Sequence, residues 1–166
     1  MNIFNQFSYP MIAAVVLVVL FLLLRRYNKA NWQGIVGAEL LAAAIFVGGW
    51  ALLQPGAGDV NDIDGAQMTL TNGRPTFIEF FSNYCTGCLL LRPSVDQLVE
   101  GIDGEFNILR VNIHSEVGRE LRQRYAFSFT PEFLLLTPNG NIVWRDHIPP
   151  SEGDLALART NDAATN

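Results

Sequence analysis

The sequence has few of the residues that build metal centres and disulfide scaffolds. Its 166 residues include two Cys and two His, which lack the spacing of a zinc-binding cluster. Charged residues make up only 16%, and acidic side chains outnumber basic ones by 16 to 11. This balance disfavours nucleic acid as a partner, and a hydrophobic share of 49% excludes a disordered or collagen-like chain. We therefore expect no metal and a chemistry that depends on very few side chains.

Two long apolar segments lie near the beginning of the chain. Residues 7–24 contain no charge, and residues 35–53 contain only Glu39. A helix needs about 20 apolar residues to cross a bilayer, so residues 1–53 are predicted to form a two-helix transmembrane hairpin. Small residues in the second segment let neighbouring helices approach closely. Glu39 lies about one turn into its helix, where we expect it to reach water.

Basic residues indicate how the hairpin is oriented. Arg25, Arg26 and Lys29 follow the first segment, and no further Lys or Arg occurs before Arg74. By the positive-inside rule the turn is cytoplasmic, so the N-terminus and the region after the hairpin lie on the extracytoplasmic side. A secretory signal peptide is the alternative. Such a peptide carries its positive charges before the apolar segment, and residues 1–10 have none.

The rest of the chain has the pattern of an α/β domain. Residues 54–64, rich in Gly, Pro and Asp, are predicted to be a tether to a domain at residues 65–160, followed by a loose tail at 161–166. Short apolar runs alternate with helical periodicity in the domain. The predicted strands are residues 76–81, 107–113, 133–137 and 141–145, and the predicted helices are residues 85–102, 116–125 and 151–159. The first strand is almost wholly apolar, which favours a central position with both faces buried.

The segment Cys85-Thr86-Gly87-Cys88 lies where the first predicted strand is followed by a helix. Backbone N–H groups and the helix dipole at this end stabilise a thiolate and lower the pKa of the first thiol. Cys85 is therefore the predicted attacking group, and Cys88, one turn further in, is the resolving group of thiol-disulfide exchange. The same spacing also occurs in half of a zinc site or in an inert pair, but the other candidate ligands are scattered through the chain.

The segment 77–88, followed by Pro93, resembles the active-site strand and helix of the thioredoxin family. Further similarity to a strand, a cis-proline loop and a closing hairpin of that family lies at residues 109–113, 125–131 and 133–144. The resemblance covers roughly residues 70–146. It implies an α/β thioredoxin-like fold, a mixed central sheet flanked by helices, preceded here by the hairpin. It also implies no cofactor other than a redox-active Cys85–Cys88 disulfide.

The resemblance implies roles for individual residues. Pro131 is expected to follow a cis peptide bond and to face the cysteines, which leaves the backbone of Thr130 able to pair with an extended substrate segment. Glu79 matches a buried carboxylate that relays a proton to or from Cys88, and the alternative is a simple ion pair with Arg110. Pro93 matches a helix-bending proline and is structural. The substrate-binding positions are Tyr84, Thr86, Gly87, Thr130 and Pro131.

The sequence departs from the family pattern beside the cysteines. Tyr84 replaces the usual Trp, and Thr86-Gly87 replaces the common Gly-Pro, a pair that tunes the redox potential. Apolar residues 89–91 replace a usual polar or basic residue. Leu89, if exposed, offers an apolar contact to a partner, whereas the next two leucines are expected in the core. The family's first strand and helix are abbreviated between residues 64 and 74, and neither His is assigned a role.

The predicted function is that of a membrane-anchored thiol-disulfide oxidoreductase on the periplasmic side of a bacterial-type membrane. Disulfides form and persist on that side, so a dithiol there needs a source or sink of electrons, such as a membrane electron donor. Resemblance to anchored thioredoxins implies that the substrates are protein thiols and disulfides, including those of apocytochromes, and a part in cell redox homeostasis. The alternative is a structural or assembly subunit that uses the thioredoxin fold to dock with other membrane subunits.

Overall fold

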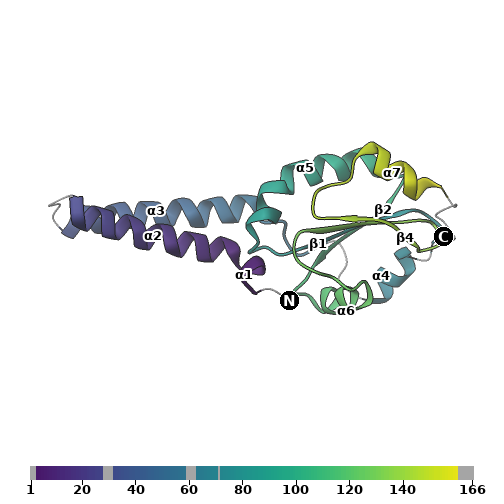
Figure 1. Cartoon of the computed structure of the whole chain (residues 1–166), viewed down its shortest axis with the longest axis horizontal. Coiled ribbons are helices and arrows are strands. Elements are labelled where there is room, and N and C mark those ends of the chain that lie inside the picture. The colour runs from purple at the N-terminus through teal and green to yellow at the C-terminus, as the bar shows by residue number, and fades with distance from the viewer. Residues whose placement is uncertain (1–2, 28–31, 59–62, 71, 161–166) are drawn as a thin grey trace.

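A computed structural model describes residues 3–27, 32–58, 63–70 and 72–160 (Figure 1). Two long helices lie side by side and project from one end of an α/β domain. The chain begins with the short helix α1 (Ile3–Gln6), continues in α2 (Ser8–Tyr27) and returns in α3 (Trp32–Leu53). Lys29 and the tail predicted at residues 161–166 lie outside the described residues.

Helices α2 and α3 are long and apolar enough, over Ser8–Arg26 and Trp32–Leu53, to cross a membrane. Compared with the predicted segments 7–24 and 35–53, α2 begins one residue later and ends three residues later, and α3 begins three residues earlier and ends at the same residue. Their outer surface is apolar, since Val15 is 62% exposed and Leu52 is 80% exposed. A soluble domain rarely leaves so continuous an apolar surface in water, so the surface of the two helices fits a lipid environment. Glu39 is half-buried, and its Oε1 is buried without a hydrogen-bond partner among the described residues.

The domain is built on a four-stranded mixed sheet. Its strands are β1 (Thr76–Phe81), β2 (Asn107–Asn112), β3 (Glu132–Leu136) and β4 (Ile142–Asp146), in the order β2-β1-β3-β4. β1 pairs in parallel with β2 and antiparallel with β3. All six residues of β1 are buried, which confirms its predicted central position. β2 ends one residue earlier than predicted, β3 begins and ends one residue earlier, and β4 begins and ends one residue later.

Helices cover both faces of this sheet (Figure 1). α5 (Thr86–Ile102), which contains Pro93, and α7 (Glu152–Arg159) lie on one face, and α4 (Ile63–Leu70) and α6 (Glu116–Arg124) lie on the other. Successive side chains of a strand point to opposite faces. Accordingly Phe77 packs in the cluster that includes residues of α5 and α7, whereas Ile78 and Phe80 pack in the cluster that includes residues of α4 and α6.

The segment predicted as a tether is partly bound to the domain. The Gly56 N–H donates to Asn83 Oδ1 at 3.0 Å, and Asn83 Nδ2 donates to the Gly56 carbonyl at 2.8 Å. Gly58 bridges to Val111 at the outer edge of β2, where a Cβ would lie 2.6 Å from the Arg110 carbonyl oxygen. The prediction over residues 54–64 is therefore corrected at both ends. Gly56 and Gly58 contact the domain, residues 59–62 lie outside the described residues, and residues 63–64 begin α4.

Candidate active site

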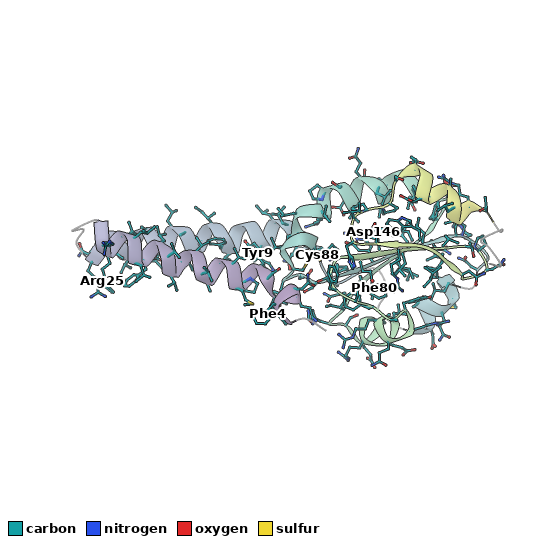
Figure 2. The ribbon with its side chains drawn as sticks, in the orientation of Figure 1. Phe4, Tyr9, Arg25, Phe80, Cys88 and Asp146 are labelled. Atoms are coloured by element: carbon teal, nitrogen blue, oxygen red, sulfur yellow. The ribbon has the colours of Figure 1, made fainter. Side chains whose placement is uncertain are left out.

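Cys85 and Cys88 lie at the start of α5, directly after β1. Cys85 is the N-cap residue, and its Sγ accepts a hydrogen bond from the backbone N–H of Cys88 at 3.3 Å. Both are free thiols, each is only 1% exposed, and they pack against Phe81. Figure 2 shows Cys88 at the end of the domain where the two long helices join it. The strand-to-helix junction predicted for the pair is present.

The two thiols have opposite pKa shifts. A hydrogen bond from the Cys88 side chain lowers the pKa of Cys85 from 9.0 to about 6, against burial, with smaller contributions from Thr130 and backbone N–H groups. Burial raises the pKa of Cys88 above its ordinary value, and the Cys85 thiolate and the charge of Glu79 act in the same direction. At neutral pH Cys85 is therefore a thiolate and Cys88 a thiol, which is the distribution needed for attack followed by resolution.

The loop before β3 lies against the cysteines. The Thr130–Pro131 peptide bond is cis, as predicted. Cys85 Sγ lies 3.5 Å from the Thr130 carbonyl oxygen. Gly87 lies next to Pro131, and a Cβ at position 87 would lie 3.2 Å from Pro131 Cδ. The missing side chain of Gly87 therefore permits the close approach of α5 to the proline. The geometry brings Cys85, Gly87, Thr130 and Pro131 together, as the sequence predicted.

Glu79 forms the ion pair that the sequence analysis left open as an alternative. It stands opposite Arg110 in the register of β1 and β2, and Arg110 Nε lies 2.6 Å from Glu79 Oε2. Arg110 Nη1 lies 2.6 Å from Asp96 Oδ1, which ties the pair to α5. Glu79 is 1% exposed, so the guanidinium compensates a carboxylate that has lost its hydration.

The backbone of Thr130, predicted to pair with a substrate segment, is hydrogen-bonded to another part of the chain in this structure. Asn5 Oδ1 accepts hydrogen bonds from the Thr130 N–H at 2.9 Å and from its Oγ1 at 2.8 Å. Asn5 Nδ2 donates to the Thr130 carbonyl at 2.8 Å. Thr86 is also engaged, because its N–H donates to Ser8 Oγ at 2.9 Å. Residues at the start of the chain therefore occupy two of the predicted substrate-binding positions.

Aromatic side chains also pack over the site, beside the contacts of Asn5 and Ser8. Tyr84 stacks on Phe7 with ring centroids 5.5 Å apart and on Trp50 with centroids 6.1 Å apart. The His114 ring lies 5.4 Å from that of Phe7, and His114 Nε2 lies 3.1 Å from Ser82 Oγ. Sequence reasoning missed Asn5, Phe7, Ser8, Trp50 and His114 as site residues. The polar side chains of residues 5 and 8, next to an apolar segment, are the only signal that the sequence offers.

The apolar triplet after Cys88 is oriented differently from the expectation. Leu89 is 2% exposed and contributes to the core, whereas Leu90 is 69% exposed. The N-cap at Cys85 sets the rotation of α5, and position 89 then faces the sheet. Leu90, rather than Leu89, is the apolar side chain open to a partner.

The site lacks the ligands of a metal centre within the part of the chain that the structure describes. There, no group of three or more Cys, His, Asp or Glu side chains is placed to hold a metal ion. The arrangement that is present, a thiolate at a helix N-terminus with a second thiol one turn away and a cis-proline beside them, is that of a thiol-disulfide exchange site.

Comparison with known proteins assigns the family. The family model named Thioredoxin matches residues 65–151, just over half of the chain, and the chain belongs to the thioredoxin family. It is 30% identical over 74 residues to the thiol:disulfide interchange protein TxlA homolog of Synechocystis sp., across 45% of this chain and 41% of that protein. It is 26% identical over 75 residues to the chloroplastic thioredoxin-like protein HCF164 of Arabidopsis thaliana, across 45% of this chain and 29% of the relative.

The matched part of this chain spans less than half of the length of either relative. Among solved structures, oxidized mitochondrial thioredoxin 3 of Saccharomyces cerevisiae has a TM-score of 0.45 at 10% identity, across 59% of this chain and 85% of that one. The fold is thioredoxin-like, a four-stranded mixed sheet flanked by helices, with two apolar helices before it.

Proposed function

We propose that this protein is a membrane-anchored thiol-disulfide oxidoreductase that acts on disulfides of extracytoplasmic proteins. The observation that carries the proposal is the state of Cys85, an N-cap thiol with a pKa of about 6 and a partner thiol one turn away. The relative in Synechocystis sp. is named as a thiol:disulfide interchange protein, which agrees with this chemistry.

The exchange has two steps. The Cys85 thiolate attacks one sulfur of a substrate disulfide, forms a mixed disulfide and releases the other substrate sulfur as a thiolate. Cys88 then loses its proton and attacks the Cys85 sulfur, which forms the Cys85–Cys88 disulfide and releases the second substrate thiol. Two electrons pass from the dithiol to the substrate, and the reverse sequence oxidises a substrate dithiol. A membrane electron donor returns the pair to the dithiol form when the protein acts as a reductase.

The surrounding residues serve these steps. Burial raises the pKa of Cys88, so its deprotonation needs an acceptor, and Glu79 is the buried carboxylate whose charge acts on that thiol. Arg110 holds Glu79 in place. Thr130 and Pro131 offer backbone groups to an extended substrate segment once the Asn5 side chain has left them, and Tyr84, Thr86 and Gly87 form the surface around Cys85.

The two apolar helices are the proposed anchor. Their length and their exposed apolar side chains fit a bilayer. Arg25 and Arg26 lie in the last turn of α2, so the positive-inside rule puts the α2–α3 turn in the cytoplasm and the catalytic domain on the opposite side. Disulfides persist in that compartment, and exported proteins such as apocytochromes are the proposed substrates.

The second candidate, a structural or assembly subunit, is favoured by one observation. Asn5 and Ser8 cover the surface that a substrate segment would use, which is the condition expected of a domain that docks permanently in a complex. Such a subunit has no use for a thiolate at Cys85, so the low pKa of this thiol supports the enzyme.

Trapping of mixed disulfides distinguishes the two candidates. In a Cys88→Ser variant, the Cys85 thiolate attacks but no thiol resolves, so substrate proteins should accumulate in covalent complexes that reductant releases. The matched Cys85→Ser variant keeps Cys88, which is protonated and buried, and should trap none. Equal trapping by the two variants would contradict the proposed oxidoreductase function. So would the absence of trapping in both variants together with unchanged assembly of membrane complexes.

A further inference from the structure

Asn5 binds Thr130 in the way that a peptide backbone would. The side-chain amide of Asn carries one carbonyl oxygen and one N–H donor group, as a peptide unit does. Its oxygen accepts from the Thr130 N–H at 2.9 Å, and its nitrogen donates to the Thr130 carbonyl at 2.8 Å. An extended segment added beside a strand makes this same pair of bonds. Asn5 therefore occupies the backbone positions that a substrate segment would need.

Three neighbouring contacts hold the same segment over the cysteines. Ser8 Oγ accepts from the Thr86 N–H at 2.9 Å, at the first residue of α5. The Gln6 carbonyl accepts from Ser82 Oγ at 3.0 Å, and the Tyr9 N–H donates to the Tyr84 carbonyl at 3.0 Å. With residues 4–9 in place, Cys85 is only 1% exposed. This exposure is too small for a substrate disulfide to approach the Cys85 sulfur along the S–S axis, as attack requires.

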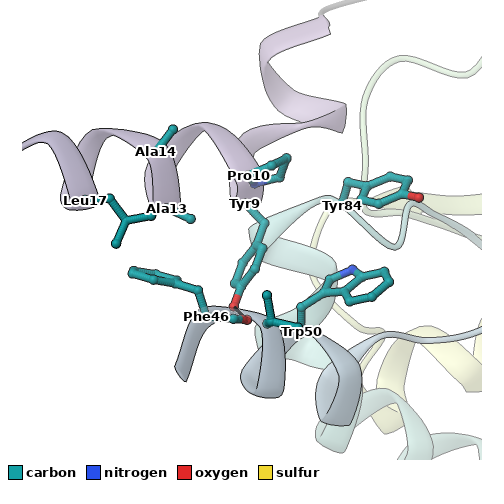
Figure 3. Close-up of a pocket in the computed structure, with 9 residues that line it drawn as sticks. Tyr9, Pro10, Ala13, Ala14, Leu17, Phe46, Trp50 and Tyr84 are labelled. Carbon is teal, nitrogen blue, oxygen red and sulfur yellow. Dashed lines mark hydrogen bonds between the residues drawn. The ribbon is translucent and has the colours of Figure 1, made fainter. Parts of the chain in front are cut away.

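The segment contacts the site through hydrogen bonds to four residues, Ser82, Tyr84, Thr86 and Thr130. Its first part, α1, is only four residues long and is followed by a break in the helix at Phe7, and Ser8 and Tyr9 are the first residues of α2. An apolar cavity of about 380 Å³ lies beside it, between the first turns of α2 and the end of α3 (Figure 3). Tyr9 of the segment lines this cavity together with Trp50 and Tyr84, so these aromatic rings have space to move.

We infer that residues 4–9 are a displaceable plug, with Asn5 as a built-in substitute for the substrate backbone, and that Cys85 reacts with protein partners only when the plug is open. The substrate side of this inference rests on the proposed oxidoreductase function, whereas the plug itself is defined by access to Cys85. A partner opens the site by replacing the Asn5–Thr130 bonds with its own backbone groups. The plug thus selects partners that present an extended segment next to their disulfide.

The test measures how fast iodoacetamide alkylates Cys85 in the reduced full-length protein in detergent micelles. It compares the wild type with Asn5→Ala and Ser8→Ala at a pH above 9.0, where Cys85 is a thiolate in every variant. We expect Asn5→Ala, which loses three hydrogen bonds, to react at least about tenfold faster, equal to about 1.4 kcal/mol. Ser8→Ala should show a smaller increase. Asn141→Ala, the same substitution at an exposed position between β3 and β4, should react as the wild type does.

Hydrogen exchange of the Thr130 amide in the wild-type protein provides a second measurement that needs no variant. An opening plug predicts that this amide exchanges faster than amides of the buried strand β1, because local opening costs less than unfolding of the sheet. Alkylation rates equal in the wild type and Asn5→Ala, or a Thr130 amide as protected as those of β1, would overturn the plug. Fast alkylation of Asn5→Ala without reduction of a disulfide protein such as insulin would keep the plug and reject the proposed function.

Discussion

Replacement of Cys88 by Ala should raise the pKa of Cys85. The side chain of Cys88 donates the hydrogen bond that contributes most to the low pKa of Cys85, about 6 instead of 9.0. With a pKa of about 6, about nine-tenths of Cys85 is thiolate at neutral pH. The backbone N–H of Cys88 and the contact with Thr130 remain in the variant, while burial still favours the thiol. We therefore expect the pKa of Cys85 to rise from about 6 toward its ordinary value of 9.0, so that a smaller share of Cys85 is ionised at neutral pH.

Ultraviolet absorbance of the thiolate, followed during a pH titration of the reduced full-length protein, measures this change without needing access to the sulfur. A Cys88→Ser variant is the matched control, because its hydroxyl still donates a hydrogen bond and should give a smaller increase. Cys85→Ala should show no thiolate around neutral pH, since burial raises the pKa of the remaining Cys88. A titration midpoint that stays near 6 in Cys88→Ala would refute the assignment of Cys88 as the main stabilising donor.

Three further predictions concern stability, measured as thermal unfolding of the full chain in detergent. Gly118→Ala should destabilise by about 3 kcal/mol or more, because its Cβ would overlap with the backbone at the end of β2, whereas Gly101→Ala in α5, with nothing within 4 Å, should be neutral or stabilising by up to about 1 kcal/mol. Arg110→Met removes the guanidinium from the buried Glu79 carboxylate and should cost about 3–5 kcal/mol, a result contradicted if the variant melts like the wild type. The depressed pKa of Cys85 means that the unfolded state binds more protons between about pH 6 and 9, so stability of the reduced protein should rise across that range and Cys85→Ser should lose the rise.

Local patterns and the family resemblance together predict the catalytic half of the site. The apolar run of β1 and the helical periodicity after it place Cys85 at the start of a helix. The cis-proline at Pro131 and the partnership of Glu79 with Arg110 are implied by the resemblance to the thioredoxin family. The resemblance can supply these contacts because they join elements of the shared fold.

Contacts that depend on how separate segments of the chain pack against one another could not be predicted. Asn5 and Thr130 lie 125 positions apart, and neither belongs to a pattern that pairs them. The N-cap residue of α5 determines which of the leucines faces the core, and Leu89 is buried while Leu90 is exposed. Three consecutive leucines do not show which of them will be buried. Gly58 likewise contacts the edge of β2 through backbone groups alone, so no side-chain pattern in the sequence predicts the contact.

The most direct test of the account is whether Cys85 and Cys88 form a reversible two-electron couple. The full-length protein in detergent would be equilibrated with glutathione buffers over a range of potentials, and its free thiols counted by mass after alkylation under denaturing conditions. The account predicts one reversible transition between two free thiols and a Cys85–Cys88 disulfide, which is lost when either cysteine is replaced by Ser. Two thiols that remain free across the whole range would contradict a thiol-disulfide exchange site in this protein.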